Sequence, residues 1–68
     1  MSPLRARRII YRVARARGLE REVSRRIVRC LHADRLADQT SAEVEHDAWN
    51  AATWVLGGGV IREQGVAR

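Results

Sequence analysis

The segment LRARRIIYRVARARGLEREVSRRIVRCLH, residues 4–32, predicts two amphipathic helices joined at a glycine. Apolar residues recur every three or four positions in both halves, which is the spacing of one helix face. Pro3 suits a first helical turn and Gly18 suits a helix C-terminus, so we place the helices at about 4–17 and 19–32. The first apolar stripe comprises Ala6, Ile9, Ile10, Val13 and Ala16, and the second comprises Leu19, Val23, Ile27 and Leu31.

A third helix is predicted for residues 41–56. Thr40 and Glu43 have the spacing of a capping box, in which each side chain bonds the backbone amide of the other residue. The acidic residues that follow suit the positive end of the helix dipole. Three glycines starting at Gly57 end the helix.

The remaining segments are predicted to be irregular. Residues 33–39 form a loop or a single short turn, with Leu36 pointing inward. Residues 57–68 form a Gly-rich turn and a C-terminal arm. The arm could be a short strand, a segment exchanged with a second protomer, or a frayed end, because short apolar runs do not distinguish these.

The length of 68 residues predicts one all-α domain, a small three-helix bundle over residues 1–56. A chain of this size buries only about 60% of its unfolded surface, so its core is small. A second protomer would enlarge that core, and we therefore expect a homodimer. The large core candidates are Ile9, Ile10, Val13, Leu19, Val23, Ile27, Leu31, Val44, Trp49, Val55 and Leu56.

Charge divides the chain into a basic and an acidic part. Residues 1–31 hold ten arginines against two acids, a net charge of +8, and residues 32–56 hold one arginine against five acids, a net charge of −4. The chain has no lysine. Arginine favours planar, bidentate contacts with phosphate or carboxylate, so the basic part predicts an anionic partner. A GC-rich genome would also replace lysine with arginine, which accounts for some of this excess.

Two rows of arginines follow the helical repeat. The rows are Arg5, Arg8, Arg12 and Arg15 on the first helix and Arg21, Arg25 and Arg29 on the second. If the partner is DNA, the second row is expected to grip guanine O6 and N7 in the groove. The first row is expected to meet phosphates, which set register and affinity. The alternative for each row is a solvated helix face.

Residues 13–28 resemble the DNA-binding helix-turn-helix motif of lac-type repressors. The matching residues are Val13, Ala14, Gly18, Leu19, Arg26, Ile27 and Val28. The resemblance implies that the second helix enters the DNA major groove and that the protein is a small phage or plasmid transcriptional regulator. Two positions depart from the pattern: Arg17 stands where a small or apolar residue is usual, and Ser24 occupies the inward position six residues after the glycine.

A second resemblance is to small helical phage anti-CRISPR proteins of the type I-E class. It is carried by Tyr11, Val13, Ala14, Gly18, Glu20, Glu22, Val23, Arg26, Ile27, Leu31 and Thr40, followed by an acidic helix with tryptophan. This resemblance implies an inhibitor or adaptor that binds a protein partner such as a Cas subunit. The arginine rows or the acidic residues 43–47 would make that contact.

The two tryptophans, Trp49 and Trp54, are five residues apart and cannot share one narrow helix stripe. We expect Trp49 in the core and Trp54 partly exposed. Exposed tryptophans often anchor interfaces, so Trp54 is the candidate for a dimer or partner contact. The alternative is that Trp54 covers the C-terminal arm.

The sequence predicts no enzyme activity, cofactor or small-molecule substrate. Cys30, His32, His46 and Asp47 lack a second ligand pair at zinc-finger spacing, so we expect no metal site. No phosphate-loop motif or plausible catalytic triad is present. One cysteine excludes an internal disulfide and fits a reducing cytoplasm, and no apolar run is long enough for a membrane span. We therefore expect a cytoplasmic protein that does not bind membranes.

Overall fold

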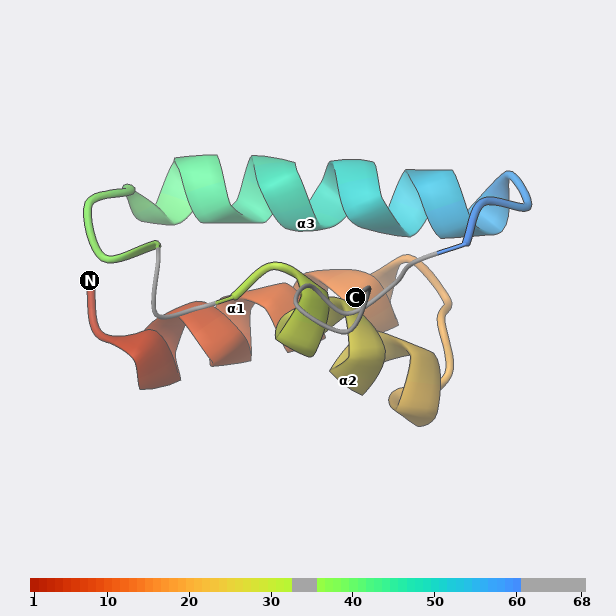
Figure 1. Cartoon of the computed structure of the whole chain (residues 1–68), viewed down its shortest axis with the longest axis horizontal. Helices are drawn as coiled ribbons and strands as arrows, with labels where there is room; N and C mark the ends of the chain where they lie inside the picture. The colour runs from red at the N-terminus through yellow and green to blue at the C-terminus, as the bar shows by residue number, and fades with distance from the viewer. Residues whose placement is uncertain (33–35, 61–68) are drawn as a thin grey trace, which may run out of the picture.

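The computed structural model describes residues 1–32 and 36–60, and these form three α-helices (Figure 1). The helices are α1 (Pro3–Ala16), α2 (Arg21–Cys30) and α3 (Ser41–Leu56). No strand occurs in the described ranges. The predicted all-α three-helix class is therefore confirmed, whereas the alternatives for the C-terminal arm from residue 61 onward lie outside the described residues.

Side-chain caps begin two of the helices. The Ser2 hydroxyl accepts a hydrogen bond of 3.2 Å from the Arg5 amide at the start of α1. At the start of α3, the Glu43 amide donates to the Thr40 hydroxyl at 3.2 Å and the Thr40 amide donates to the Glu43 carboxylate at 2.8 Å. The predicted capping box is therefore present, and α3 begins and ends at the predicted residues.

Gly18 ends α1 as predicted. Its φ of +95° lies in the left-handed region, which a residue without a Cβ adopts at little cost. The Gly18 amide donates to the Arg15 carbonyl and the Leu19 amide donates to the Ala14 carbonyl, which is the Schellman pattern. The same pattern at Gly58, also with a φ of +95°, closes α3.

Helix α2 is shorter than the predicted range of 19–32. Glu20 is its N-cap in an extended conformation and Leu31 is its C-cap, so the helix has ten residues. Leu19 precedes the helix and is buried, and Leu31 follows it and is half-buried. Both leucines continue the apolar stripe from outside the helix, which is why the periodicity overestimated its length.

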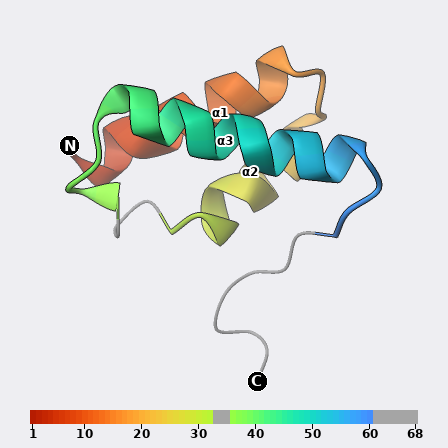
Figure 2. The ribbon, with the colours of Figure 1, turned by 90° about the horizontal axis from the view of Figure 1, so that it is seen from above.

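Helix α1 contacts both of the other helices. It packs along α3 on one side and against α2 on another, while α2 and α3 touch each other very little (Figure 1). Seen from above, α3 crosses over the other two helices, with α1 toward one side of it and α2 toward the other (Figure 2). The molecule is flattened, with extents of 31 × 30 × 17 Å, so most helix faces remain close to solvent.

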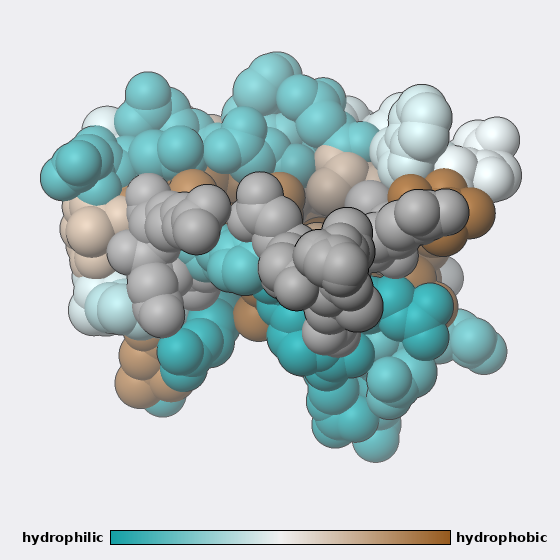
Figure 3. Space-filling model, in the orientation of Figure 1, coloured by the Kyte–Doolittle hydropathy of each residue, from teal (hydrophilic) through white to brown (hydrophobic). Residues whose placement is uncertain are grey.

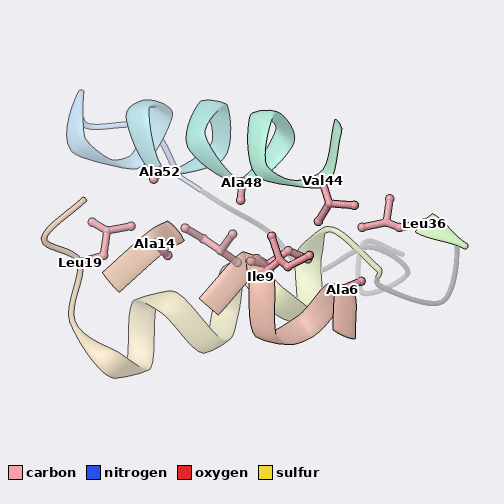
Figure 4. Close-up of a cluster of buried hydrophobic side chains, with 10 residues drawn as sticks. Ala6, Ile9, Ala14, Leu19, Leu36, Val44, Ala48 and Ala52 are labelled. Atoms are coloured by element: carbon pink, nitrogen blue, oxygen red, sulfur yellow. The ribbon is translucent and has the colours of Figure 1, made fainter. Parts of the chain in front are cut away.

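Small residues make up a large part of the core. Four of its ten members are alanines, and in Figure 4 the α3 alanines point toward α1. Val13, Val23 and Val55 are only partly buried. The buried residues are Ala6, Ile9, Ile10, Ala14, Leu19, Ile27, Leu36, Val44, Ala48 and Ala52.

Two large side chains predicted for the core are on the surface. Trp49 is 49% exposed and Leu56 is 52% exposed. Ala48 and Ala52 lie on the face of α3 that points toward α1 (Figure 4), whereas Trp49 follows Ala48 by one residue and therefore lies on a different face of the helix. The predicted core position of Trp49 was therefore wrong, whereas the inward position of Leu36 is confirmed.

Ser24 provides a test of this core. Its side chain is fully buried on α2, and its hydroxyl has no hydrogen-bond partner in the described part of the chain. We expect Ser24→Ala to raise the free energy of unfolding by about 1 kcal/mol, because it removes an unsatisfied polar group and adds helix propensity. Urea unfolding followed by circular dichroism measures the change.

Ser2→Ala is the matched control for Ser24→Ala. It removes the same hydroxyl, but at Ser2 that hydroxyl caps α1. We expect Ser2→Ala to lower the free energy of unfolding by about 1 kcal/mol. Destabilisation by both variants would show that the Ser24 hydroxyl is satisfied in solution.

Candidate nucleic-acid interface

A hollow between α1 and α2 collects cationic side chains from both helices. Its lining is Arg7, Arg8 and Tyr11 from α1, and Arg25, Val28 and Arg29 from α2. We call this site the arginine hollow. The three residues of each set lie within about one helical turn, so each helix presents one compact edge to it. Its volume is about 420 Å³.

The charges of the three helices differ in sign. Helix α1 carries five arginines and no acid (+5), α2 carries four arginines and one glutamate (+3), and α3 carries three acids and no arginine (−3). Because α3 runs along one side of the molecule in Figure 1, negative charge lies on that side, and the arginine hollow lies between the two positive helices. In Figure 3, hydrophilic side chains gather over α2 at the lower edge of the molecule.

The predicted arginine row of α1 does not act as one unit. Arg8 lines the arginine hollow, but the Arg12 guanidinium donates to the Glu45 carboxylate of α3 at 3.0 Å. Arg15 donates to the backbone carbonyl of Leu19 at 3.0 Å. Arg5 is exposed near the start of the helix. The structure therefore directs only part of this row toward the arginine hollow.

The predicted row of α2 stays together on an exposed face. Arg21, Arg25 and Arg29 are all exposed, and the last two line the arginine hollow. Arg29 also lies 3.9 Å from the Glu22 carboxylate. Both side chains of this pair are largely exposed, so the pair contributes little to stability.

Sequence reasoning missed Arg7 and Tyr11 as site residues. They lie four positions apart on α1, on the edge that faces α2, and Tyr11 is half-buried. Their i, i+4 spacing was a usable signal, but which edge of α1 meets α2 depends on how the two helices pack. Periodicity alone does not give that orientation.

Arg17 stands where a helix-turn-helix motif usually has a small or apolar residue, and its side chain contacts α3. Its guanidinium lies 3.9 Å from the centroid of the Trp49 ring, and it donates a hydrogen bond of 2.9 Å to the Thr53 hydroxyl. The Thr53 hydroxyl in turn donates to the Trp49 carbonyl at 2.9 Å. These contacts join the end of α1 to α3, so Arg17 holds the bundle together at its turn.

Trp54 is 60% exposed, which fits the predicted exposed position. Its indole N–H donates to the Val60 carbonyl at 3.2 Å, and a Cβ on Gly59 would overlap the ring. Trp54 therefore covers the first residues after α3 while keeping most of its ring in solvent.

Three further properties concern only the described part of the chain. No group of three or more His, Cys, Asp or Glu side chains is placed to hold a metal ion there. None of the described helices combines the length and apolar character that crossing a bilayer requires. Cys30 is half-buried and forms no disulfide.

Comparison with known proteins gives no match: no family model fits the chain, and neither a curated protein nor a solved structure is similar to it.

The contact between Arg17 and Trp49 can be measured by a double-mutant cycle. We expect Arg17→Ala and Trp49→Ala each to lower the free energy of unfolding, with a coupling of about 0.5–1 kcal/mol from the cation–π contact. Urea unfolding of both single variants and the double variant gives this coupling. Additive effects would mean that the stacked geometry contributes nothing to stability.

Proposed function

We propose that the protein binds DNA through the face formed by α1 and α2, as a small helix-turn-helix regulator of phage or plasmid type. The observation that carries the proposal is the arginine hollow, where Arg8 of α1 and Arg25 of α2 lie on one surface. Guanidinium groups from two helices on one surface can contact several phosphates of a single strand. Phosphate contacts of this kind provide most of the affinity for nucleic acid.

The helix-turn-helix assignment is supported by the packing of the turn. The short turn between α1 and α2 contains Gly18 and the buried Leu19, and Ser24 and Ile27 are the buried positions of α2. This packing leaves the row of Arg21, Arg25 and Arg29 on the outward side of α2. In a helix-turn-helix, that side of the second helix approaches base edges in the major groove.

The acidic helix α3 supports the proposed orientation. Its three carboxylates would repel DNA phosphates, whereas the arginines of α1 and α2 attract them. Arg12 is paired with Glu45, which partly neutralises its charge, so we expect a weaker phosphate contact from Arg12 than from the other arginines of its row. We therefore assign phosphate contacts to Arg5 and Arg8 first, and base contacts to Arg25 and its neighbours in the row.

The DNA proposal predicts salt-sensitive binding to duplex DNA. Each phosphate contact adds about −0.9 to the slope of log affinity against log salt concentration, so three to four contacts give a slope of about −3. Titration of a fluorescent duplex at several salt concentrations, followed by anisotropy, measures this slope. Affinity that does not change with salt would contradict DNA binding through these arginines.

Arg25→Ala and Arg26→Ala form a matched pair for the same assay. Both residues are exposed arginines on α2, but only Arg25 lines the arginine hollow. We expect Arg25→Ala to weaken binding to a selected duplex by about tenfold, more than on random DNA, because a bidentate guanine contact is lost. Arg26→Ala should cost about twofold. Equal losses for the two variants would contradict base reading by Arg25.

A second candidate function is a protein-binding inhibitor or adaptor of the anti-CRISPR type that acts as a dimer. It is favoured by the exposed apolar side chains at and just after the C-terminal end of α3, which are Trp54, Leu56 and Val60. Such residues suit a protein interface better than a DNA surface. Sedimentation of the full chain at increasing concentration tests self-association, with Leu56→Ser expected to weaken it.

A further inference from the structure

The arginine hollow combines a cationic rim with apolar groups. Tyr11 of α1 and Val28 of α2 both line it, and both are only half-buried. Exposed ring and methyl carbons are removed from water only when a ligand with apolar surface covers them. A well-fitting ligand therefore has an apolar part as well as negative charge.

The size of the arginine hollow suits a ligand larger than one phosphate group. Its volume of about 420 Å³ falls within the range of sites that take small organic molecules. A nucleobase is planar and apolar on both faces, and it stacks on aromatic rings and on guanidinium planes. Its phosphates supply the negative charge that arginine binds. A nucleotide therefore matches both parts of the site.

The nucleotide must be unpaired to reach these groups. A paired base inside a duplex is stacked on both faces, so neither face is open to Tyr11. Unstacking is least costly for bases in single strands, bulges or mismatches. The Glu22 carboxylate lies 3.9 Å from the Arg29 guanidinium on α2, so phosphates are expected to lie toward Arg8, on the α1 part of the rim.

We propose that the arginine hollow binds one unpaired nucleotide, with its base against Tyr11 and Val28 and its flanking phosphate on Arg8. The proposal rests on the proposed DNA binding and adds a preference: bulged or single-stranded DNA binds more tightly than a perfect duplex of equal charge. The base is held by stacking, so its identity matters less than its being unpaired.

Three DNA ligands of the same sequence test the proposal with the unaltered full chain. The first is a perfect duplex, the second carries one bulged adenine nucleotide, and the third carries an abasic nucleotide at the bulge. The two bulged ligands have the same phosphates, so they differ only in the base. We expect the bulged adenine to raise affinity about tenfold over the perfect duplex, and the abasic bulge to lose most of that gain.

Variants of Tyr11 test whether the higher affinity for the bulged adenine arises at the arginine hollow. Tyr11→Phe keeps the ring and is expected to keep the preference for the bulged adenine, whereas Tyr11→Ala is expected to remove it. Circular dichroism checks that each variant folds. Should Tyr11→Ala not fold, the comparison of the adenine and abasic ligands with the unaltered protein still decides the question.

The possible failures are distinguishable. Equal, salt-sensitive affinity for all three ligands, still reduced by Arg25→Ala, would overturn the unpaired-nucleotide proposal and leave the proposed DNA binding standing. A tighter complex with both bulges, regardless of the base, would overturn it as well, because bent DNA alone would explain the gain. Salt-insensitive binding to every ligand would overturn the proposed function itself.

Discussion

The close contact of α1 with α3 determines the arrangement of the other parts. Alanines fill this contact, with Ala6 and Ala14 on α1 and Ala48 and Ala52 on α3. Small side chains allow two helices to approach closely, and dispersion contacts grow as the distance falls. Helix α1 thereby has one edge committed to α3, so α2 can pack only on another edge. The arginine hollow forms along that second contact.

This arrangement also divides the arginines of α1 and of its C-cap by the helix they face. Arg12 contacts Glu45 of α3, and the C-cap residue Arg17 contacts Thr53 and Trp49 of α3. Arg7 and Arg8 line the hollow beside α2. The arginines of one basic helix therefore have two kinds of contact: some face the acidic helix α3, and others line the arginine hollow. Codon usage does not explain such a division, because it acts on composition and not on position.

Much of the fold was predictable because its determinants are local. The capping box of Thr40 and Glu43 and the glycine at position 58 set the ends of α3, and Gly18 set the end of α1. The position of Trp49 was not predictable in this way. Its place outside the core depends on the close approach of α1 and α3 and on Arg17, which belongs to a different helix.

The candidate site was only partly predictable for the same reason. Helical spacing identified Arg8, Arg25 and Arg29, because the repeat of one helix is enough to place them on exposed faces. It did not bring Tyr11 and Arg7 into the same site, since that requires knowing which edge of α1 faces α2. The half-buried position of Tyr11 likewise depends on how α1 packs against α2, which the residue pattern of α1 alone does not show.

Like charges around the arginine hollow oppose folding in the free protein, and the small core has little stability to offset them. Arg8 and Arg25 come from different helices, so their repulsion acts across the α1–α2 contact. An anion bound between them replaces repulsion with attraction and also covers Tyr11 and Val28. A ligand that binds only the folded state stabilises it in proportion to its affinity and concentration. If the protein binds DNA as proposed, a polyanion held at this surface would therefore also stabilise the bundle.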